Sequence, residues 1–438
     1  MGKLTLKGRV HPYDGKEFTK DKPIKELYPE GDMVFPLSQH IGAPANPVVA
    51  KGDHVLAGQL IAEAGGFISA NIHSSVSGTV KAIEPRTLAT GGKCNSIIIE
   101  NDGKYEEVAY VTRKLEDLTN DEIRERVKAA GVVGMGGAGF PTNVKLTPKD
   151  PAAIDYIIVN GAECEPYLTS DYRRMLEESE RIVTGLKVAL KLFDNARGVI
   201  AIEDNKPEAI EVMTKACAGE SRISVKTMKT KYPQGGERCL IYAVTGREIN
   251  SSMLPADAGC IVHNIDTISS IYYAVIEGKP LTKRIMTVTG DGVKEPQNFY
   301  VWLGMNYRQL LEAAGGAVGE PEKYISGGPM MGFAMYSLDV PVVKGSSSLL
   351  VFQKDVVKDL EASACIRCGK CGSACPSRLL PAKLATLASK GNADAFAALD
   401  GMECVECGSC SFICPAKRPL AQNIKAMRRQ IMANRRKK

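Results

Sequence analysis

Two short cysteine runs near the end of the 438-residue sequence restrict its structure more than any other feature. Each run has the same spacing, with a proline directly after its fourth cysteine: Cys365, Cys368, Cys371, Cys375 and Pro376, then Cys404, Cys407, Cys410, Cys414 and Pro415. Three closely spaced thiolates wrap one face of an iron–sulfur cubane, and in two-cluster proteins of this spacing the fourth thiolate comes from the other run. The pattern therefore predicts two [4Fe-4S] clusters with crossed ligands: Cys365, Cys368, Cys371 and Cys414 for one, and Cys404, Cys407, Cys410 and Cys375 for the other.

Structural zinc sites are the alternative interpretation, because four thiolates also bind zinc. Zinc sites use two pairs of cysteines, however, and give no role to a third closely spaced cysteine or to one that precedes a proline. The sequence starts MGKLTLKGRV, without an apolar signal core, and has no apolar run near the roughly 18 residues that cross a bilayer. We therefore expect reduced, metal-binding thiols in a cytosolic or peripherally bound protein without a transmembrane segment.

Positive charge is concentrated around the cysteines. Residues 365–438 contain 14 Lys and Arg against 4 Asp and Glu, a net charge of +10, so the rest of the chain carries −4 within a total of +6. This surplus is either a solvated basic tail or a set of cations that offsets the negative clusters and docks an acidic partner or a membrane surface. For residues 425–438 we expect an interaction surface on a helix.

Patterns in the rest of the chain predict three more units. Strand and turn signals fill residues 33–100 at the spacing of a compact β-sandwich. A helix is predicted over 119–131, and residues 131–284 alternate buried strands with helical segments, which indicates an α/β domain. Strand, turn, helix and glycine-turn signals over 284–332 suggest a small β-grasp unit. A helix predicted over 381–390 makes the cysteine-rich unit mainly helical.

A glycine-rich loop at 134–139 satisfies the G-x-G-x-x-G pattern of dinucleotide-binding Rossmann domains. Its context does not fit that fold, because the loop follows a predicted helix and not a strand. By itself such a loop is as often a tight turn as a phosphate site. The residues around the loop are more specific than the loop itself.

From Gly131 to Leu146 the sequence GVVGMGGAGFPTNVKL resembles the flavin-binding loop of the NADH-oxidising flavoprotein subunit of respiratory complex I. The resemblance implies that flavin mononucleotide (FMN) binds through Gly134, Gly136, Gly137, Gly139, Phe140, Thr142 and Lys145. Backbone N–H groups without side chains suit a phosphate, and a lysine near the flavin ring stabilises its reduced, anionic form.

Two further segments extend this resemblance. Residues 159–166, VNGAECEP, are similar to the family's Asn-Ala-Asp-Glu-x-Glu-Pro stretch, which implies that Asn160 and Glu163 touch the flavin side and Glu165 the nicotinamide side of bound NAD(H). Residues 232–238, YPQGGER, are similar to a later Gly-Glu-Glu stretch and add Gly235, Gly236 and Glu237. The family has Arg, Asp and Glu at the positions of Met135, Ala162 and Arg238, so the nicotinamide contacts differ in detail. No catalytic acid or base is expected.

The order of the units resembles the RnfC component of the Rnf complex, a membrane-bound ferredoxin:NAD oxidoreductase that moves sodium ions or protons. The resemblance implies an N-terminal barrel-sandwich hybrid over 1–118, an FMN- and NADH-binding α/β domain over 119–284, a soluble-ligand-binding (SLBB-like) β-grasp domain over 285–345 and a dicluster [4Fe-4S] domain with a basic tail over 360–438. It also implies hydride exchange between NAD(H) and FMN and single-electron exchange with the two clusters.

The partners that this resemblance implies are the other Rnf subunits, including integral membrane subunits, NADH, and ferredoxin through the complex. Peripheral attachment to the cytoplasmic face of the inner membrane follows from the same resemblance, and no nucleic acid is expected. The sequence distinguishes neither the direction of the reaction nor the ion that is moved.

Two other functions fit parts of the pattern. A soluble cobalamin-reducing flavoprotein is built from similar modules, but that family starts at the flavin loop, and about 130 residues precede the loop here. A flavin-free relay of electrons through the two clusters is the non-enzymatic alternative, and the departures from the complex I pattern motivate it.

Overall fold

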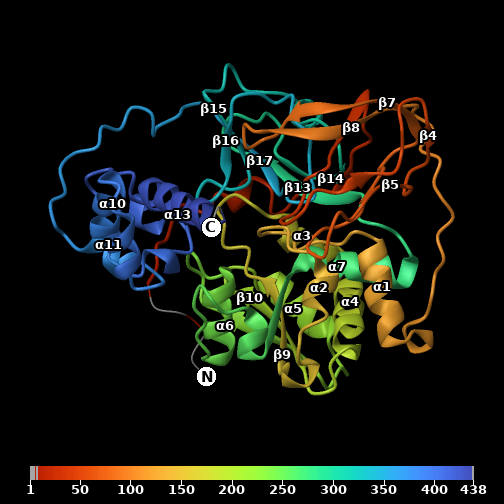
Figure 1. Ribbon diagram of the computed structural model, residues 1–438, viewed down its shortest axis with the longest axis horizontal. Helices are drawn as coiled ribbons and strands as arrows, with labels where there is room; N and C mark the ends of the chain where they lie inside the picture. The colour runs from red at the N-terminus through yellow and green to blue at the C-terminus, as the bar shows by residue number, and fades with distance from the viewer. Residues whose placement is uncertain (1–4, 6–7, 437–438) are drawn as a thin grey trace.

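The computed structural model describes residue 5 and residues 8–436, which form four successive groups of elements. Figure 1 shows two β-rich groups together at the top, an α/β group below them and a helical group at one side. Residues 1–4, 6 and 7, at the start of the predicted first domain, lie outside the described residues, as do Lys437 and Lys438 of the basic tail. Within the described ranges, no helix has the length and apolar character needed to span a bilayer.

The first group packs two small antiparallel sheets, as the strand and turn pattern predicts. One sheet has the order β2-β8-β7-β4 and the other β3-β5-β6. The strands are β2 (Asp32–Pro36), β3 (Asn46–Pro47), β4 (His54–Val55), β5 (Leu60–Glu63), β6 (Ile72–His73), β7 (Gly78–Thr87) and β8 (Lys93–Asn101). In the turn before β7, where carrier domains of this type present a lysine, Val76 is fully buried and Ser75 Oγ donates to the Leu303 carbonyl at 2.6 Å. This group is therefore docked on the rest of the chain.

Four parallel strands form the centre of the α/β group, in the order β11-β10-β9-β12. They are β9 (Tyr156–Gly161), β10 (Arg197–Glu203), β11 (Ile223–Met228) and β12 (Cys260–Asn264). Ile157 and Ile158 belong to separate hydrophobic clusters because helices and loops cover both faces of the sheet, which explains the continuous apolar run. The predicted α/β architecture is confirmed, although the sequence pattern did not indicate β11.

Within the described chain, seven α-helices accompany this sheet: α1 (Asn120–Ala129), α2 (Thr142–Lys145), α3 (Ser170–Glu177), α4 (Ser179–Lys191), α5 (Pro207–Ala216), α6 (Glu237–Thr245) and α7 (Ile265–Tyr272). The first of them begins at a capping box, in which Thr119 Oγ1 accepts from the Glu122 amide and the Glu122 carboxylate accepts from the Thr119 amide. This reciprocal cap fixes the helix that leads directly into the glycine-rich loop.

The β-grasp group contains a six-stranded sheet in the order β1-β14-β13-β17-β15-β16. Its elements are β13 (Lys283–Thr289), β14 (Gln297–Trp302), α8 (Tyr307–Ala313), β15 (Lys323–Ser326), β16 (Phe333–Met335) and β17 (Ser348–Phe352). Two of these strands come from outside the predicted unit of 285–345: β1 (Lys25–Glu26) pairs with β14, and β17 lies in the middle of the sheet. Strand pairing over such a distance leaves no local signal in the sequence.

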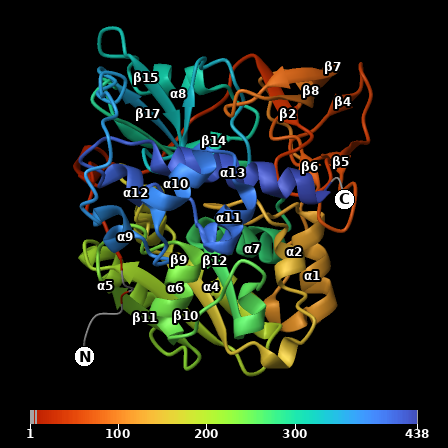
Figure 2. The same cartoon turned by 60° about the vertical axis from the view of Figure 1, so that its left-hand side comes forward.

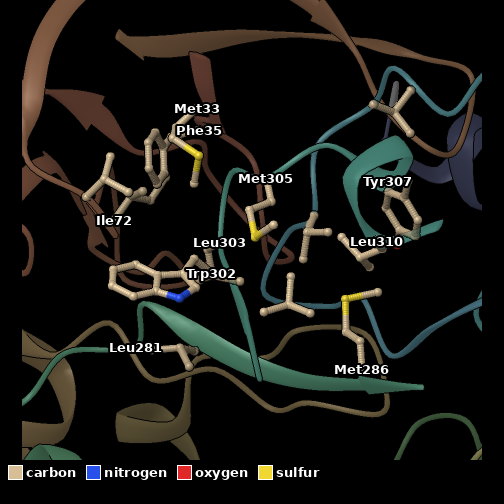
Figure 3. Packing of buried hydrophobic residues seen from close by; sticks show 14 of the residues in the cluster. Met33, Phe35, Ile72, Leu281, Met286, Trp302, Leu303, Met305, Tyr307 and Leu310 are labelled. Carbon is tan, nitrogen blue, oxygen red and sulfur yellow. The ribbon is translucent and has the colours of Figure 1, made fainter. Parts of the chain in front are cut away.

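The two β-rich groups share one hydrophobic core. Met33, Phe35 and Ile72 from the sandwich belong to the same buried cluster as Trp302 and Met305 from the β-grasp group. Figure 3 shows these side chains filling the space between the two groups. A core of this extent makes the sandwich and the β-grasp group a single rigid support.

The last group is helical, as predicted, with α9 (Lys370–Ala374), α10 (Pro381–Ser389), α11 (Ala393–Ala398), α12 (Ser409–Phe412) and α13 (Leu420–Arg436). A long connection after β17 leads to it, and Figure 2 shows its helices lying across the junction between the α/β group and the β-rich groups. Leu384 and Phe396 form a small core with Ile424 and Met427 of α13, and five of the eight cysteines of the two runs belong to it or pack against it. The predicted basic helix is therefore part of the fold of this group.

Candidate functional site

Cys365, Cys368, Cys371 and Cys414 line one cavity of about 290 Å³, which we call the outer cavity. The structure thus brings together three thiols of the first run and the last thiol of the second run. Cys365 and Cys368 are exposed, whereas the other two are partly buried.

Cys375, Cys404, Cys407 and Cys410 line a second and narrower cavity, which we call the inner cavity. Two of these thiols, Cys407 and Cys410, are buried. In neither cavity do the thiols converge on a point, because among the described residues no three His, Cys, Asp or Glu side chains lie close enough to hold a single metal ion. Each set of four surrounds a space.

The two cysteine runs repeat one backbone conformation. The residue before the second cysteine is left-handed in both, with φ of 56° at Arg367 and 57° at Glu406. Turns in the runs direct backbone amides at sulfur: Glu406 N donates to Cys404 Sγ and Leu379 N to Cys375 Sγ, each at 3.4 Å. Amides that point at cysteine sulfur are typical of iron–sulfur sites, so the residues present fit two clusters.

The two sets of thiols differ in their acidity. Burial raises the pKa of Cys404 to about 11 and that of Cys410 to about 12, whereas the backbone amide of Arg367 lowers the pKa of Cys365. Because thiolates are the ligands, metal binding must displace protons that the inner thiols hold at neutral pH. Cluster binding at the inner set therefore releases protons and is favoured by higher pH.

The glycine-rich loop lies at the carboxyl ends of β9 and β12. Lys145 Nζ donates to the Val262 carbonyl at 3.1 Å, and a Cβ atom on Gly136 would lie 3.3 Å from Asn264 Nδ2. The strand order reverses between β9 and β12, since the chain proceeds from β9 to β10 and β11 and then returns to the other side of β9. Ligands of open parallel sheets bind at such a switch point, beyond the carboxyl ends of the strands.

Glycine conformation keeps the backbone of this loop open. Gly136 and Gly139 have φ of 79° and 70°, and a Cβ atom on Gly137 would meet no other atom within 4 Å. Gly134 N donates to the Phe140 carbonyl at 2.8 Å, which closes the loop on itself. Met135 N donates to Thr267 Oγ1 at 2.9 Å, whereas the amides of Gly136 and Gly137 donate to no described residue and are available to a phosphate.

Buried polar atoms without partners surround the loop. Thr142 Oγ1 and both ring nitrogens of His263 are buried and make no hydrogen bond to any described residue. Burial lowers the pKa of His263 to about 3, and the nearby Lys145 ammonium contributes to this lowering, so the imidazole is neutral. Buried polar groups in native proteins are normally satisfied, and a bound polar ligand is one way to satisfy them. Thr142 was predicted, but His263 and Asn264 carry no motif that marks them.

The acidic motif after β9 is engaged by backbone amides. Glu163, with φ of 44°, accepts from Asp171 N at 2.7 Å and from Tyr172 N at 3.2 Å, at the start of α3. Glu165 Oε1 accepts from the amides of Met330 and Met331 in the glycine turn of the β-grasp group, at 2.8 and 2.9 Å. Glu163 is buried and Glu165 partly buried, and desolvation raises the pKa of each. These hydrogen bonds hold the acidic motif against the start of α3 and against the glycine turn of the β-grasp group.

Two buried lysines that the sequence pattern did not indicate support this motif. Lys206 Nζ donates to the Ala162 carbonyl at 2.7 Å, and Lys16 Nζ donates to the carbonyls of Glu165 at 3.1 Å and Leu168 at 2.5 Å. Lys16 comes from the N-terminal segment, so a part of the chain without any recognisable motif contributes to the site. Both ammonium groups offset the negative charge of the buried acids.

The second predicted segment meets the first across the site. Asn160 Nδ2 donates to the Gly235 carbonyl at 2.8 Å, and Gly235 N donates to Cys164 Sγ at 3.2 Å. Gly236 precedes α6, and the Glu237 carboxylate lies 3.7 Å from Lys145 Nζ. The structure therefore gathers the glycine loop, Asn160, the 235–237 segment and Lys145 in one region.

A seam of apolar and sulfur-containing side chains joins this region to the inner cavity. Cys407 is buried with Tyr232, and Cys164 and Met330 pack against them. A Cβ atom on Gly408 would lie 3.1 Å from the Met330 carbonyl oxygen, so the backbones approach closely. The inner cavity therefore lies against the α/β group, next to the motif that contains Glu165.

Three departures from the complex I pattern have visible structural roles. Met135 is buried and its amide donates to Thr267 Oγ1 at 2.9 Å. Ala162 is fully buried, and its carbonyl accepts from Lys206 Nζ at 2.7 Å. Arg238 Nη1 donates to Glu403 Oε2 at 2.8 Å, across the junction to the helical group. These substitutions leave the backbone of the glycine loop accessible.

Four known domain families match the chain in the order of these groups. They are described as the RnfC barrel sandwich hybrid domain (residues 4–104), the Nuo51 FMN-binding domain (127–273), the SLBB domain (285–334) and the 4Fe-4S dicluster domain (364–417). The matches confirm the predicted fold class and two of the predicted cofactors, FMN and a pair of [4Fe-4S] clusters.

Relatives that match across most of the chain give the same result. The C subunit of the proton-translocating ferredoxin:NAD(+) oxidoreductase complex of Clostridium ljungdahlii is 48% identical over 389 residues, which cover 88% of this chain and 85% of the relative. The C subunit of the Na(+)-translocating complex of Acetobacterium woodii is 45% identical, with 99% of this chain and 98% of the relative covered. The C subunit of the ion-translocating oxidoreductase complex of Rhodobacter capsulatus is 39% identical, with 87% and 74% covered. The chain belongs to the RnfC family, the C subunits of ion-translocating ferredoxin:NAD(+) oxidoreductase complexes.

Proposed function

We propose that this chain is the peripheral nicotinamide-handling subunit of such a complex, attached at the cytoplasmic face of the membrane. It exchanges electrons with NAD(H) at the glycine-loop region and passes them through the two cysteine sites. The observation that carries the proposal is the seam at Cys407, which joins the inner cavity to the α/β group at the motif containing Glu165. A flavin site and a cluster site in separate lobes would give no such route.

FMN, when bound, exchanges two electrons as hydride with nicotinamide and one electron at a time with iron–sulfur centres. The chain itself binds and orients. The amides of Gly136 and Gly137 supply N–H donors for the phosphate, and the Lys145 ammonium favours negative charge on the bound group. Phe140, Gly139, Gly235 and Gly236 shape the walls, and Asn160 holds the two segments together.

The acidic residues act as positioning groups. Glu163 fixes α3, Glu165 ties the site to the β-grasp turn, and Glu237 sets Lys145 through their ion pair. A cluster held by the inner set of thiols would be the one placed to exchange electrons with the flavin, since that set contacts the α/β group, and a cluster held by the outer set would extend the route to the surface. The direction of net flow depends on the partners of the complex.

The flavin-free relay receives no support from the three departures. Met135 is accommodated in the core, Ala162 leaves space for Lys206, and Arg238 holds the helical group in place. The soluble cobalamin reductase is disfavoured because the N-terminal sandwich shares its core with the β-grasp group and is integral to the fold. Relatives of the family move either protons or sodium ions, so the ion is a property of the whole complex.

Anaerobic reconstitution of the full chain tests the proposal. Flavin content is measured after gel filtration, and reduction of ferricyanide by NADH reports the nicotinamide site without any partner. We expect about one FMN per chain and NADH-dependent reduction. The Lys145→Ala variant should lose flavin while keeping its iron, because Lys145 lines neither cysteine cavity. Full iron content with no flavin in the native chain would favour the relay.

A further inference from the structure

The outer cavity opens on a surface that combines exposed apolar side chains with cations. Ile366 is 66% exposed and Leu380 58% exposed, and both line the cavity beside the exposed thiols of Cys365 and Cys368. The inner cavity, by contrast, is packed against the α/β group. Of the two cluster sites, the outer one is therefore placed to exchange electrons with another molecule.

Cations surround this opening. Arg367, Lys383 and Arg418 line the cavity, and Lys370 and Lys417 are exposed in the same turns. No acidic residue lines it among the residues that the structure describes. Two of the four acidic side chains of 365–438 are neutralised elsewhere, Glu403 by Arg238 and Glu406 by Lys425 and Arg428, and the others, Asp394 and Asp400, lie on or after α11.

Offsetting the charge of a bound cluster does not account for this distribution. Charge is more costly in a buried site than in an exposed one, so the inner cluster needs neighbouring cations more. Yet no lysine or arginine of the described chain lines the inner cavity, whose only charged lining residue is Glu406. Near the inner set, Arg428 and Lys425 pair with Glu406, and Arg428 also acts on Cys404, whereas five cations lie at the exposed outer site, where the cost of charge is smallest. This surplus at the exposed site indicates an external partner.

We propose that this face, consisting of Ile366, Arg367, Lys370, Leu380, Lys383, Lys417 and Arg418, docks an acidic electron-transfer protein or domain with its redox centre near its own surface. The cations attract and orient the acidic partner, and the apolar side chains form the dry centre of the contact. One electron passes in each encounter: the outer cluster is oxidised and the partner's centre reduced, or the reverse, and no bond forms or breaks. The inference rests on the function proposed above.

A lipid surface is the competing occupant, because anionic headgroups attract the same cations. A bilayer has no redox centre to bring to the cavity, however, and contact with lipid would seal the exposed cluster from its electron partner. The position of the cations around the cavity therefore favours an acidic protein.

Charge reversal at two positions tests this surface. The variant Lys370→Glu/Lys417→Glu changes exposed side chains that do not line the cavity, and the control Lys51→Glu/Lys215→Glu makes the same charge change on distant exposed lysines. The reconstituted full chains are titrated onto membranes from cells that lack this subunit. We expect affinity at low salt to fall about tenfold or more for the first variant only, with the difference shrinking as salt rises.

Carbodiimide cross-linking, which joins lysine amines to carboxylates, identifies what lies on the face. We expect Lys370, Lys383 or Lys417 to be joined to Asp or Glu of a cofactor-containing protein. Unchanged membrane affinity of the first variant would overturn the proposal, as would equal, charge-dependent binding to protein-free phosphatidylglycerol vesicles without such cross-links. Iron content and NADH:ferricyanide activity are measured on the same samples; if they are normal, failure of docking leaves the proposed function intact.

Discussion

The Glu403→Gln substitution tests whether a single carboxylate fastens the helical group to the α/β group. Glu403 precedes the inner ligand Cys404 and accepts from Arg238 Nη1 and from Ser251 N, each at 2.8 Å. Burial by itself would raise the pKa of Glu403, but the hydrogen bonds from Ser251 and the Arg238 guanidinium hold it below its usual range. The carboxylate is therefore charged at neutral pH, and glutamine removes that charge while keeping the shape.

The expected magnitude follows from the contacts. A hydrogen bond to a charged group contributes about 1.5 to 3 kcal/mol. Arg238 and Glu403 are 28% and 29% exposed, so solvent screening favours the lower figure, about 1.5 kcal/mol. This corresponds to a shift of roughly tenfold in the equilibrium between docked and opened helical group.

Native-state hydrogen exchange measures that opening. The amides of Val10 and Tyr232, which bond to each other's carbonyls beside the inner cavity, should lose about tenfold in protection in Glu403→Gln. Protection of β9 and β10 should be unchanged, and Asp394→Asn serves as a control within the helical group. Unaltered protection at Val10 and Tyr232 would show that the apolar seam alone holds the groups together, contrary to this reasoning.

Three further substitutions probe other parts of the account. Gly136→Ala should weaken FMN retention about tenfold in equilibrium dialysis, because a left-handed residue with a side chain costs roughly 1–2 kcal/mol. Gly219→Ala is the control, since Gly219 has φ of 89° and open surroundings and lies away from the site. Equal flavin loss in both variants would contradict the assignment. Cys407→Ser should halve the iron content and slow reduction of the remaining cluster by NADH, whereas normal reduction would show that the inner site is not on the route. Lys344 is fully buried, and burial lowers its pKa to about 7. Because the folded state disfavours the charged form, folding stability should rise with pH between 7 and 10. Lys344→Met should flatten that rise in thermal unfolding, and an unchanged slope would refute the lowered pKa.

Features that depend on residues close together in the sequence could be predicted. The crossed grouping of thiols follows from a rule about cysteine intervals, and the structure gathers the same two sets. The glycine loop was recognisable because backbone access to a phosphate demands glycine at particular intervals. Strands β9, β10 and β12 were visible because burial on both faces makes continuous apolar runs.

Features that depend on distant pairing could not be predicted. β17 lies between β13 and β15, although β15 precedes it in sequence, and β1 joins a strand more than 270 positions later. Lys16 and Lys206 are ordinary surface-type residues in sequence, and only the fold places them beneath the acidic motif. Arg238 departs from the related flavoprotein pattern, and only the fold shows that it serves the junction with the helical group.

Low-temperature electron paramagnetic resonance of the anaerobically prepared, dithionite-reduced chain tests the central claim most directly. Crossed ligation holds two paramagnetic [4Fe-4S] clusters close together, so the account predicts a spin-coupled spectrum from two interacting centres, with roughly eight iron and eight sulfide per chain. A single isolated signal, or a silent sample that contains zinc in place of iron, would contradict it.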